Sequence, residues 1–246
     1  MEINEYIIKC PKRDFTCIEF KFNHNDSKDV ERLNKLISSG RELATKVNPA
    51  LAMDSSRTRD FETVLKNAIA GVLAEFCWRY WLNDQARKMN VNLEVKTPEF
   101  KNTTNQIDMI VSYSHNVTKS IEVRSSFPYT GLKNAVCRAF RILGWYTNPI
   151  KSKEIQKDYY VGVLFPFETS EFYEKLKSEL FSCYLSGGAT RKLLQQSEHA
   201  KDKELIPYYD IDMTYSPQVA RYRVIEPIVN GYDAKEITQH ILRGNE

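Results

Sequence analysis

The sequence predicts a protein of the mixed α/β (α+β) class, with a central mixed sheet flanked by helices. Residues 107–113 and 117–123 are rich in Val, Ile, Tyr and Thr and flank a polar tip, as in an antiparallel hairpin. Residues 61–80 carry apolar side chains at i, i+3, i+4 spacing, which indicates an amphipathic helix. Residues 159–167 are almost continuously apolar, as in a strand that is buried on both faces.

The N-terminal part of the chain predicts a hairpin followed by a helix. Residues 3–9 and 15–22 are two β-like runs separated by a turn that contains proline. Asp26 and Ser27 can cap a helix that extends to about residue 46. This unit carries no catalytic signature, so we expect it to be a flank packed onto the core or to contact a substrate or partner.

The middle of the chain predicts an ordered series of elements after the helix at 61–80. Residues 91–95 favour a strand and residues 101–105 a polar turn before the hairpin. Thr130 can cap a further helix that continues to about residue 143, ahead of the apolar run. The expected order is therefore helix, strand, strand, strand, helix, strand.

The C-terminal part is expected to add helices and late strands. It first predicts a helix that begins at Ser170 and ends before Gly187 and Gly188, and then a short helix at 191–196. A solvated charged stretch at 198–204, strands within 221–229 and a closing helix at 234–242 are expected to follow. We divide the chain into an N-terminal flank (1–50), a core (51–167) and a C-terminal extension packed on the core (168–246).

Each strand of the central hairpin carries one acidic residue between apolar neighbours. Side chains alternate between the faces of a strand, so Asp108 and Glu122 point away from the apolar face. If the tip is centred on His115, the two carboxylates lie opposite each other with Cβ atoms about 5 Å apart. Like charges so placed are destabilising, and a divalent cation such as Mg²⁺ or Mn²⁺ would remove the repulsion. Arg124, two residues after Glu122, shares their face.

An acid, a turn, and then an acid-x-base sequence on the returning strand resembles the motif of the PD-(D/E)XK nuclease superfamily, which has the restriction-endonuclease-like fold. Asp108 matches the first acid, Glu122 the second and Arg124 the final base. Two residues depart from the pattern, because Ile107 stands where the family has proline and Arg124 where it has lysine. The expected order of elements is also that of the family core.

The resemblance implies a further metal ligand on the helix that precedes the hairpin. The family often places a glutamate there, and Glu62, in the first turn, matches it better than Glu75. The resemblance therefore implies a metal site made by Asp108, Glu122 and Glu62, and we expect Glu75 to be solvated. The alternative for Glu62 is a first-turn acid that the helix dipole favours.

The function that the resemblance implies is Mg²⁺-dependent hydrolysis of DNA phosphodiester bonds, with Mn²⁺ as a second usable metal. Asp108, Glu122, Arg124 and Glu62 would form the catalytic site. Polar and basic residues that follow the hairpin are candidates for phosphate contacts, or else belong to a solvated face: Ser125, Ser126, Lys133, Arg138 and Arg141. A restriction-type enzyme of type II, a phage or mobile-element nuclease, a repair nuclease and a homodimeric assembly all stay open.

Two other functions are consistent with the same residues. The first is a DNA-binding protein that kept the nuclease scaffold and lost the chemistry, which the arginine at position 124 favours. It would bind DNA without Mg²⁺ and leave it intact. The second is an unrelated α+β domain, in which Asp108 and Glu122 pair with Arg124 and a neighbouring lysine. It would have no affinity for metal.

Composition sets only broad limits on these functions. The formal net charge of +3 is too small to indicate a nucleic-acid partner and does not exclude one. The five cysteines are scattered without a C-x-x-C pair, so we expect reduced thiols and a cytoplasmic protein: Cys10, Cys17, Cys77, Cys137 and Cys183. The N-terminus does not resemble a signal peptide, and no apolar run is long enough to cross a membrane, so we expect no membrane partner.

Overall fold

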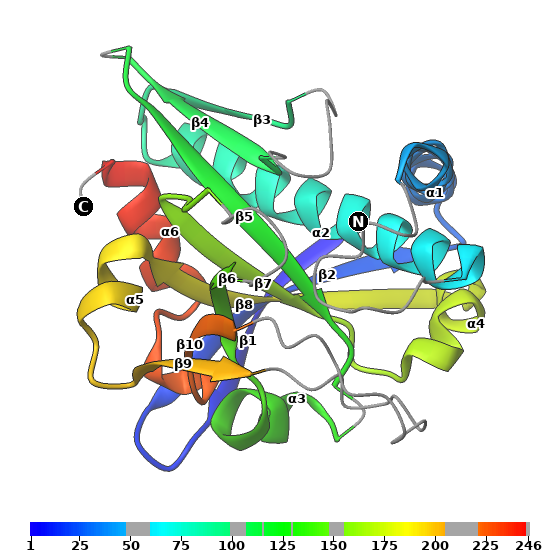
Figure 1. Cartoon of the computed structure of the whole chain (residues 1–246). Helices are drawn as coiled ribbons and strands as arrows, with labels where there is room; N and C mark the ends of the chain where they lie inside the picture. Colours follow the sequence, from blue (N-terminus) through cyan, green and yellow to red (C-terminus); the bar gives the residue numbers. More distant parts are fainter. Residues whose placement is uncertain are drawn as a thin grey trace.

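A computed structural model describes residues 1–47, 60–98, 107–114, 116–128, 130–147, 155–204 and 221–244. The chain forms a seven-stranded sheet in the order β1-β2-β8-β7-β5-β4-β3 and a three-stranded sheet in the order β6-β10-β9. Strand β7 runs parallel to β5, and the other neighbours described in the large sheet are antiparallel. Helices flank the large sheet (Figure 1). The predicted mixed class, with a mixed sheet flanked by helices, is confirmed.

The elements have the following bounds. The large sheet consists of β1 (Glu2–Lys9), β2 (Asp14–Asn23), β3 (Leu93–Lys96), β4 (Met109–Tyr113), β5 (Thr118–Ser126), β7 (Tyr159–Leu164) and β8 (Leu180–Thr190). The small sheet consists of β6 (Ile142–Thr147), β9 (Ala200–Glu204) and β10 (Arg221–Ile225). The helices are α1 (Ser27–Lys46), α2 (Phe61–Lys88), α3 (Leu132–Asn134), α4 (Phe172–Lys177), α5 (Arg191–Gln196) and α6 (Ala234–Arg243), with single turns η2 (Ala135–Ala139), η3 (Thr169–Glu171) and η4 (Ile228–Asn230).

Helix α2 covers one face of the large sheet and is the longest helix that the structure describes. Its apolar stripe is completely buried at Leu73, Cys77 and Trp78. The indole of Trp78 also donates a hydrogen bond of 3.1 Å to the carbonyl oxygen of Gly162 in β7. A tryptophan with an apolar body and one satisfied polar atom fixes the helix against the strand. The predicted helix is therefore the element that closes the core over β5 and β7.

The N-terminal hairpin and helix form as predicted, but the hairpin is part of the large sheet. Strand β2 pairs with β8, which pairs with β7, so strands from all three predicted ranges share one sheet. The side chain of Asp26 accepts a hydrogen bond of 2.8 Å from the backbone N–H of Lys28 and caps α1. Helix α1 packs closely on α2, because a Cβ at Gly40 would lie 2.7 Å from the Cα of Ile69.

Several predicted elements were wrong in type. The expected helix from Ser170 ends at Lys177, and residues 180–190 form β8 instead, because β2 and β7 pair with that segment on its two sides. The expected helix from Thr130 is only the short α3 and the π-type turn η2, and residues 142–147 form β6. The expected solvated stretch contains β9, which pairs with β10. Pairing with distant strands outweighs local helical spacing in each case.

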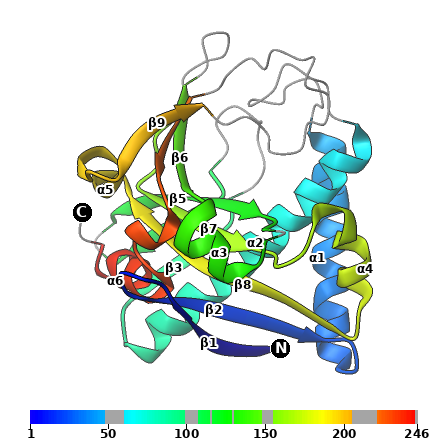
Figure 2. The same cartoon turned by 90° about the horizontal axis from the view of Figure 1, so that it is seen from below.

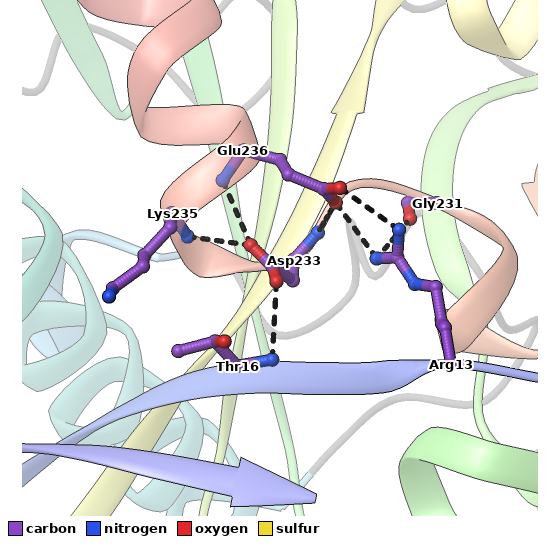
Figure 3. Close-up of polar contacts among 6 residues, drawn as sticks. All are labelled: Arg13, Thr16, Gly231, Asp233, Lys235 and Glu236. Atoms are coloured by element: carbon purple, nitrogen blue, oxygen red, sulfur yellow. Dashed lines mark hydrogen bonds and ion pairs between the residues drawn. The ribbon is translucent and has the colours of Figure 1, made fainter. Parts of the chain in front are cut away.

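Helix α6 forms where it was predicted and is tied to the N-terminal hairpin by a polar network (Figure 3). The carboxylate of Asp233 caps the helix by accepting hydrogen bonds from the backbone N–H groups of Lys235 and Glu236, both at 2.9 Å. It also accepts one from the backbone N–H of Thr16 at 3.3 Å. Glu236 accepts a hydrogen bond of 2.8 Å from Arg13. The C-terminal helix is thereby fixed against β2.

The cysteines are not all reduced as predicted. Cys10 and Cys137 form a disulfide with Cα atoms 5.5 Å apart, which joins the turn after β1 to η2. The two residues are 127 positions apart, and only the packing of the hairpin against η2 brings them together. Cys17, Cys77 and Cys183 are buried free thiols. In the described ranges, no helix combines the length and the apolar character needed to cross a membrane.

Candidate active site

The central hairpin has the predicted register. Met109 of β4 pairs with Ile121 of β5, and the pairing continues toward the tip without a shift in register. Asp108 directly precedes this first pair and Glu122 directly follows it, so the two acids lie at the point where β4 begins beside β5. His115, on which the prediction centred the tip, lies outside the described residues. Alternation along the two strands places both carboxylates on the same side of the hairpin.

Strand β5 turns its functional side chains away from α2. Ile121 pairs with Tyr159 of β7, and both belong to the core beneath α2. The alternate residues Glu122, Arg124 and Ser126 therefore face the opposite side of the sheet. On that side, the second apolar cluster, η2 and the small sheet cover β7 and β8. Figure 2 shows β6 and β9 on this side, away from α1 and α2.

Two contacts hold the acids in place. The backbone N–H of Val123 donates a hydrogen bond of 2.7 Å to Oδ2 of Asp108, so this carboxylate lies against the strand that carries Glu122. Glu122 is 7% exposed, and its Oε1 lies 3.1 Å from Nη2 of Arg124. Burial raises the pKa of Asp108 well above its ordinary value, and the charges of Glu122 and Glu75 raise it further. The Val123 N–H and Arg124 act in the opposite direction.

The glutamate of α2 that interacts with these acids is Glu75, which corrects the choice of Glu62. Burial and then the charge of Glu122 raise the pKa of Glu75 to about 8, against the opposing effect of Arg79. Glu62 is exposed, and its charge acts on Tyr173. Glu62 lies thirteen residues earlier on the helix, which corresponds to about 20 Å along the axis. Glu75 is therefore the acid of α2 whose charge acts on Asp108, and Glu62 lies farther along the helix.

A signal for Glu75 was present in the sequence. It is the only charged residue between Lys66 and Arg79, in the most apolar part of the helix. An acid in such a stretch is costly to bury unless it has a charge partner or a bound cation. The prediction that Glu75 is solvated was therefore wrong, because the apolar stripe passes on both sides of it.

The donor set of the three acids fits a hard divalent cation. Carboxylate oxygens are the ligands that Mg²⁺ and Mn²⁺ prefer, and the mutual repulsion of the acids gives a cation a favourable electrostatic position. In the described part of the chain, no three His, Cys, Asp or Glu side chains are already arranged around one point. The Glu122 carboxylate instead contacts Arg124. Asp108 and Glu122 would thus be the central ligands, and the charge of Glu75 acts on both of them from α2.

The predicted phosphate-contact residues separate into two groups. Ser126 and Arg141 line a small cavity together with Arg124. Ser125 lies on the α2 side of β5, because its neighbour in β7 is the core residue Val163. The other two are exposed, Lys133 on α3 and Arg138 on η2. Only Ser126 and Arg141 are therefore brought beside Arg124.

Comparison with known proteins gives a relative without a described activity. No family model matches the chain, and no solved structure matches it. The uncharacterized protein MJECS01 of Methanocaldococcus jannaschii is 24% identical over 231 residues. The match covers 86% of this chain and 82% of that protein. The similarity therefore extends over most of both chains.

Proposed function

We propose that this protein is a metal-dependent endonuclease that hydrolyses DNA phosphodiester bonds on a restriction-endonuclease-like fold. The observation that carries the proposal is the position of Asp108 and Glu122, side by side at the start of β4 and beside Arg124. Two mutually repelling acids with a fixed cation beside them suit the binding of Mg²⁺ or Mn²⁺ and a phosphate. A purely structural sheet gains little from this arrangement.

The order of elements supports the same proposal. From α2 the chain passes through β3, β4, β5 and the short helical segment α3–η2, and then returns as β7 parallel to β5. This is the helix, three strands, helix and strand that the nuclease family would have. Strand β6 is an addition between η2 and β7 that pairs with β10 in the small sheet. The N-terminal hairpin extends the large sheet at its other edge.

The residues of the site divide the chemistry among them. A divalent cation, when bound, would polarise the scissile phosphate and lower the pKa of a water molecule. Asp108 and Glu122 would hold that cation, and the charge of Glu75 would add to its attraction. The guanidinium of Arg124 stays protonated at any working pH, so it would bind a phosphate oxygen and could not accept a proton. A phosphate that binds Arg124 would replace Glu122 as the partner of the guanidinium. The Glu122 carboxylate would then be available to bind the metal.

A plasmid assay tests the proposal. Supercoiled DNA is incubated with the wild type and with the variants Asp108→Asn, Glu122→Gln and Glu62→Gln, in Mg²⁺, in Mn²⁺ and in EDTA. We expect the wild type to nick DNA in either metal and not in EDTA, and both site variants to lose activity. Glu62→Gln is the matched control on the same protein and should retain it. A wild type that never nicks, or an Asp108→Asn variant that nicks normally, contradicts the proposal.

The alternative is a catalytically inactive, nuclease-like protein that binds DNA. The ion pair between Glu122 and Arg124 favours it, because the second acid already has a partner and arginine stands where the family has lysine. Such a protein would bind DNA equally well with and without Mg²⁺ and would leave it intact. An unrelated domain would bind neither DNA nor metal. The same plasmid, assayed for binding and for nicking, separates the three.

A further inference from the structure

Glu226, directly after β10, holds three basic side chains. Its carboxylate oxygens lie 3.0 Å from Nζ of Lys201 and 2.8 Å from Nζ of Lys203. The guanidinium of Arg141 also donates a hydrogen bond to it. Burial would raise the pKa of Glu226, but the hydrogen bonds from Lys203, Arg141 and Lys201 outweigh this effect and lower the pKa to about 2. We call these four residues the basic cluster.

The pairing of the small sheet assembles the basic cluster. Lys201 and Lys203 lie two positions apart on β9, opposite Val224 and Tyr222 of β10. Glu226 follows Val224 by two positions and so extends the same face. Two side chains from β9 and one from the residue before β6 thus converge on one carboxylate, which no spacing in the sequence reveals.

The basic cluster carries more positive charge than its acid can neutralise. Three cations against one carboxylate leave two net positive charges at a surface where the side chain of Lys201 is 54% exposed and that of Lys203 is 34% exposed. A surface ion pair contributes about 0–1 kcal/mol, so stability does not require a second and third cation. An excess of positive charge among the described residues of such a surface attracts a polyanion.

The basic cluster also adjoins the candidate active site. Arg141 lines the same small cavity as Arg124 and Ser126, and Arg124 contacts Glu122. Cations therefore lie at both ends of this arrangement, Arg124 beside the paired acids and Arg141 beside the lysines of the small sheet. The spacing of charges along a strand of DNA suits such a line of contacts, because each phosphate offers an anionic oxygen to an arginine or a lysine.

We propose that Arg141, Lys201 and Lys203 bind the phosphate backbone of DNA and direct it to Asp108 and Glu122, while Glu226 holds the three cations in place until phosphates replace it. The inference rests on the proposed function for the identity of the polyanion. These contacts position the duplex and carry no sequence information. Glu226 acts as an internal competitor of the phosphates, so its charge weakens DNA binding.

The test is the affinity for a fluorescent DNA duplex in Ca²⁺, measured by anisotropy over a series of salt concentrations. We expect the double variant Lys201→Ala with Lys203→Ala to bind at least tenfold more weakly, and its slope of log K against log salt to fall by about two. Lys201→Arg with Lys203→Arg should retain the wild-type slope. Glu226→Gln should bind several-fold more tightly. The matched control is Lys88→Ala with Lys235→Ala, two lysines that pair with Asp84 and Glu5 elsewhere on the surface and should leave affinity unchanged.

The inference is overturned if the alanine double variant binds with the wild-type affinity and slope, or if Glu226→Gln, folded as judged by circular dichroism, binds no more tightly. Plasmid nicking in Mg²⁺, run in parallel, separates the two proposals. Salt-dependent binding that the lysine variant loses, with no nicking by the wild type, supports the basic cluster and contradicts the nuclease. Nicking by the wild type with unchanged DNA affinity in the lysine variant supports the nuclease and contradicts the basic cluster.

Discussion

Asp108 accepts a hydrogen bond of 2.7 Å from the backbone N–H of Val123, and this contact places its carboxylate against the strand segment that carries Glu122. The pairing of Met109 with Ile121 sets this relationship. Each acid lies in a position that is set by the hairpin and not by a flexible loop. The cost of the arrangement is the burial of the carboxylates and then the repulsion between them, and both effects raise the pKa of Asp108. The first two predictions follow from that cost.

Without a divalent cation, the protein should lose stability as the pH rises from 5 to 8. The folded state keeps a proton on Glu75 up to a pKa of about 8, whereas the unfolded chain releases it near the ordinary glutamate pKa of 4.5. The folded state therefore binds more protons in this window, and the unfolding free energy falls with pH, by on the order of 3 kcal/mol. Glu75→Gln should remove part of this loss, and Glu62→Gln should not. Urea unfolding at pH 5 and pH 8 measures the change in unfolding free energy. The same change in the wild type and in Glu75→Gln would contradict the prediction.

Mg²⁺ or Mn²⁺ should stabilise the protein more at pH 8 than at pH 6. The cation must displace protons from Asp108 and Glu75, so binding at lower pH competes with protonation. Calorimetric titrations in two buffers of different ionisation enthalpy should show proton release on binding at pH 6. Asp108→Asn should abolish the thermal stabilisation by metal, and Glu62→Gln should leave it intact. Equal stabilisation at both pH values, or in Asp108→Asn, is the contrary result.

Arg124→Ala should abolish cleavage while DNA binding in Ca²⁺ persists. A cation that contacts the phosphate chiefly in the transition state affects turnover more than affinity, and its loss should lower the single-turnover rate about 10²–10³-fold. Arg124→Lys should retain or raise activity, because lysine is the residue of the family pattern. Unchanged cleavage by Arg124→Ala would mean that another cation has this role, with Arg141, which lines the same cavity, as the next candidate. Cleavage seen only in Arg124→Lys would favour the inactive DNA-binding protein.

Removing the disulfide should destabilise the fold. The bond between Cys10 and Cys137 closes a loop of 127 residues, so Cys10→Ser should lower the unfolding free energy by about 3–5 kcal/mol in the chain-entropy model. A reductant should lower the stability of the wild type to the same level and should not affect Cys10→Ser further. Equal urea midpoints for wild type and Cys10→Ser under oxidising conditions would contradict the pairing.

The sequence was sufficient where the pattern is local. The register of the central hairpin follows from the alternation of apolar residues around a short tip, and α2 follows from an unbroken helical stripe. The sequence was insufficient where pairing is distant. Residues 180–190 have helical spacing, but β2 and β7 bind them as a strand, and Cys10 meets Cys137 only through packing.

The candidate site shows the same division. Asp108, Glu122 and Arg124 could be selected from the hairpin because period-2 alternation fixes which side chains share a face. The acid on α2 could not be selected in this way. A family pattern favoured Glu62 in the first turn, whereas the charge that raises the pKa of Asp108 from α2 is that of Glu75, in the middle of the helix. Glu226 and its lysines depend on strand pairs that the sequence did not predict.

The central claim is that Asp108 and Glu122 hold the cation that supports DNA cleavage. Electron paramagnetic resonance with Mn²⁺ measures bound metal directly, in the same samples that are assayed for nicking. We predict a tight Mn²⁺ site in the wild type and in Glu62→Gln that is lost in both Asp108→Asn and Glu122→Gln, with nicking lost in step. Mn²⁺ binding that survives in both site variants, or nicking that survives without it, would contradict the account.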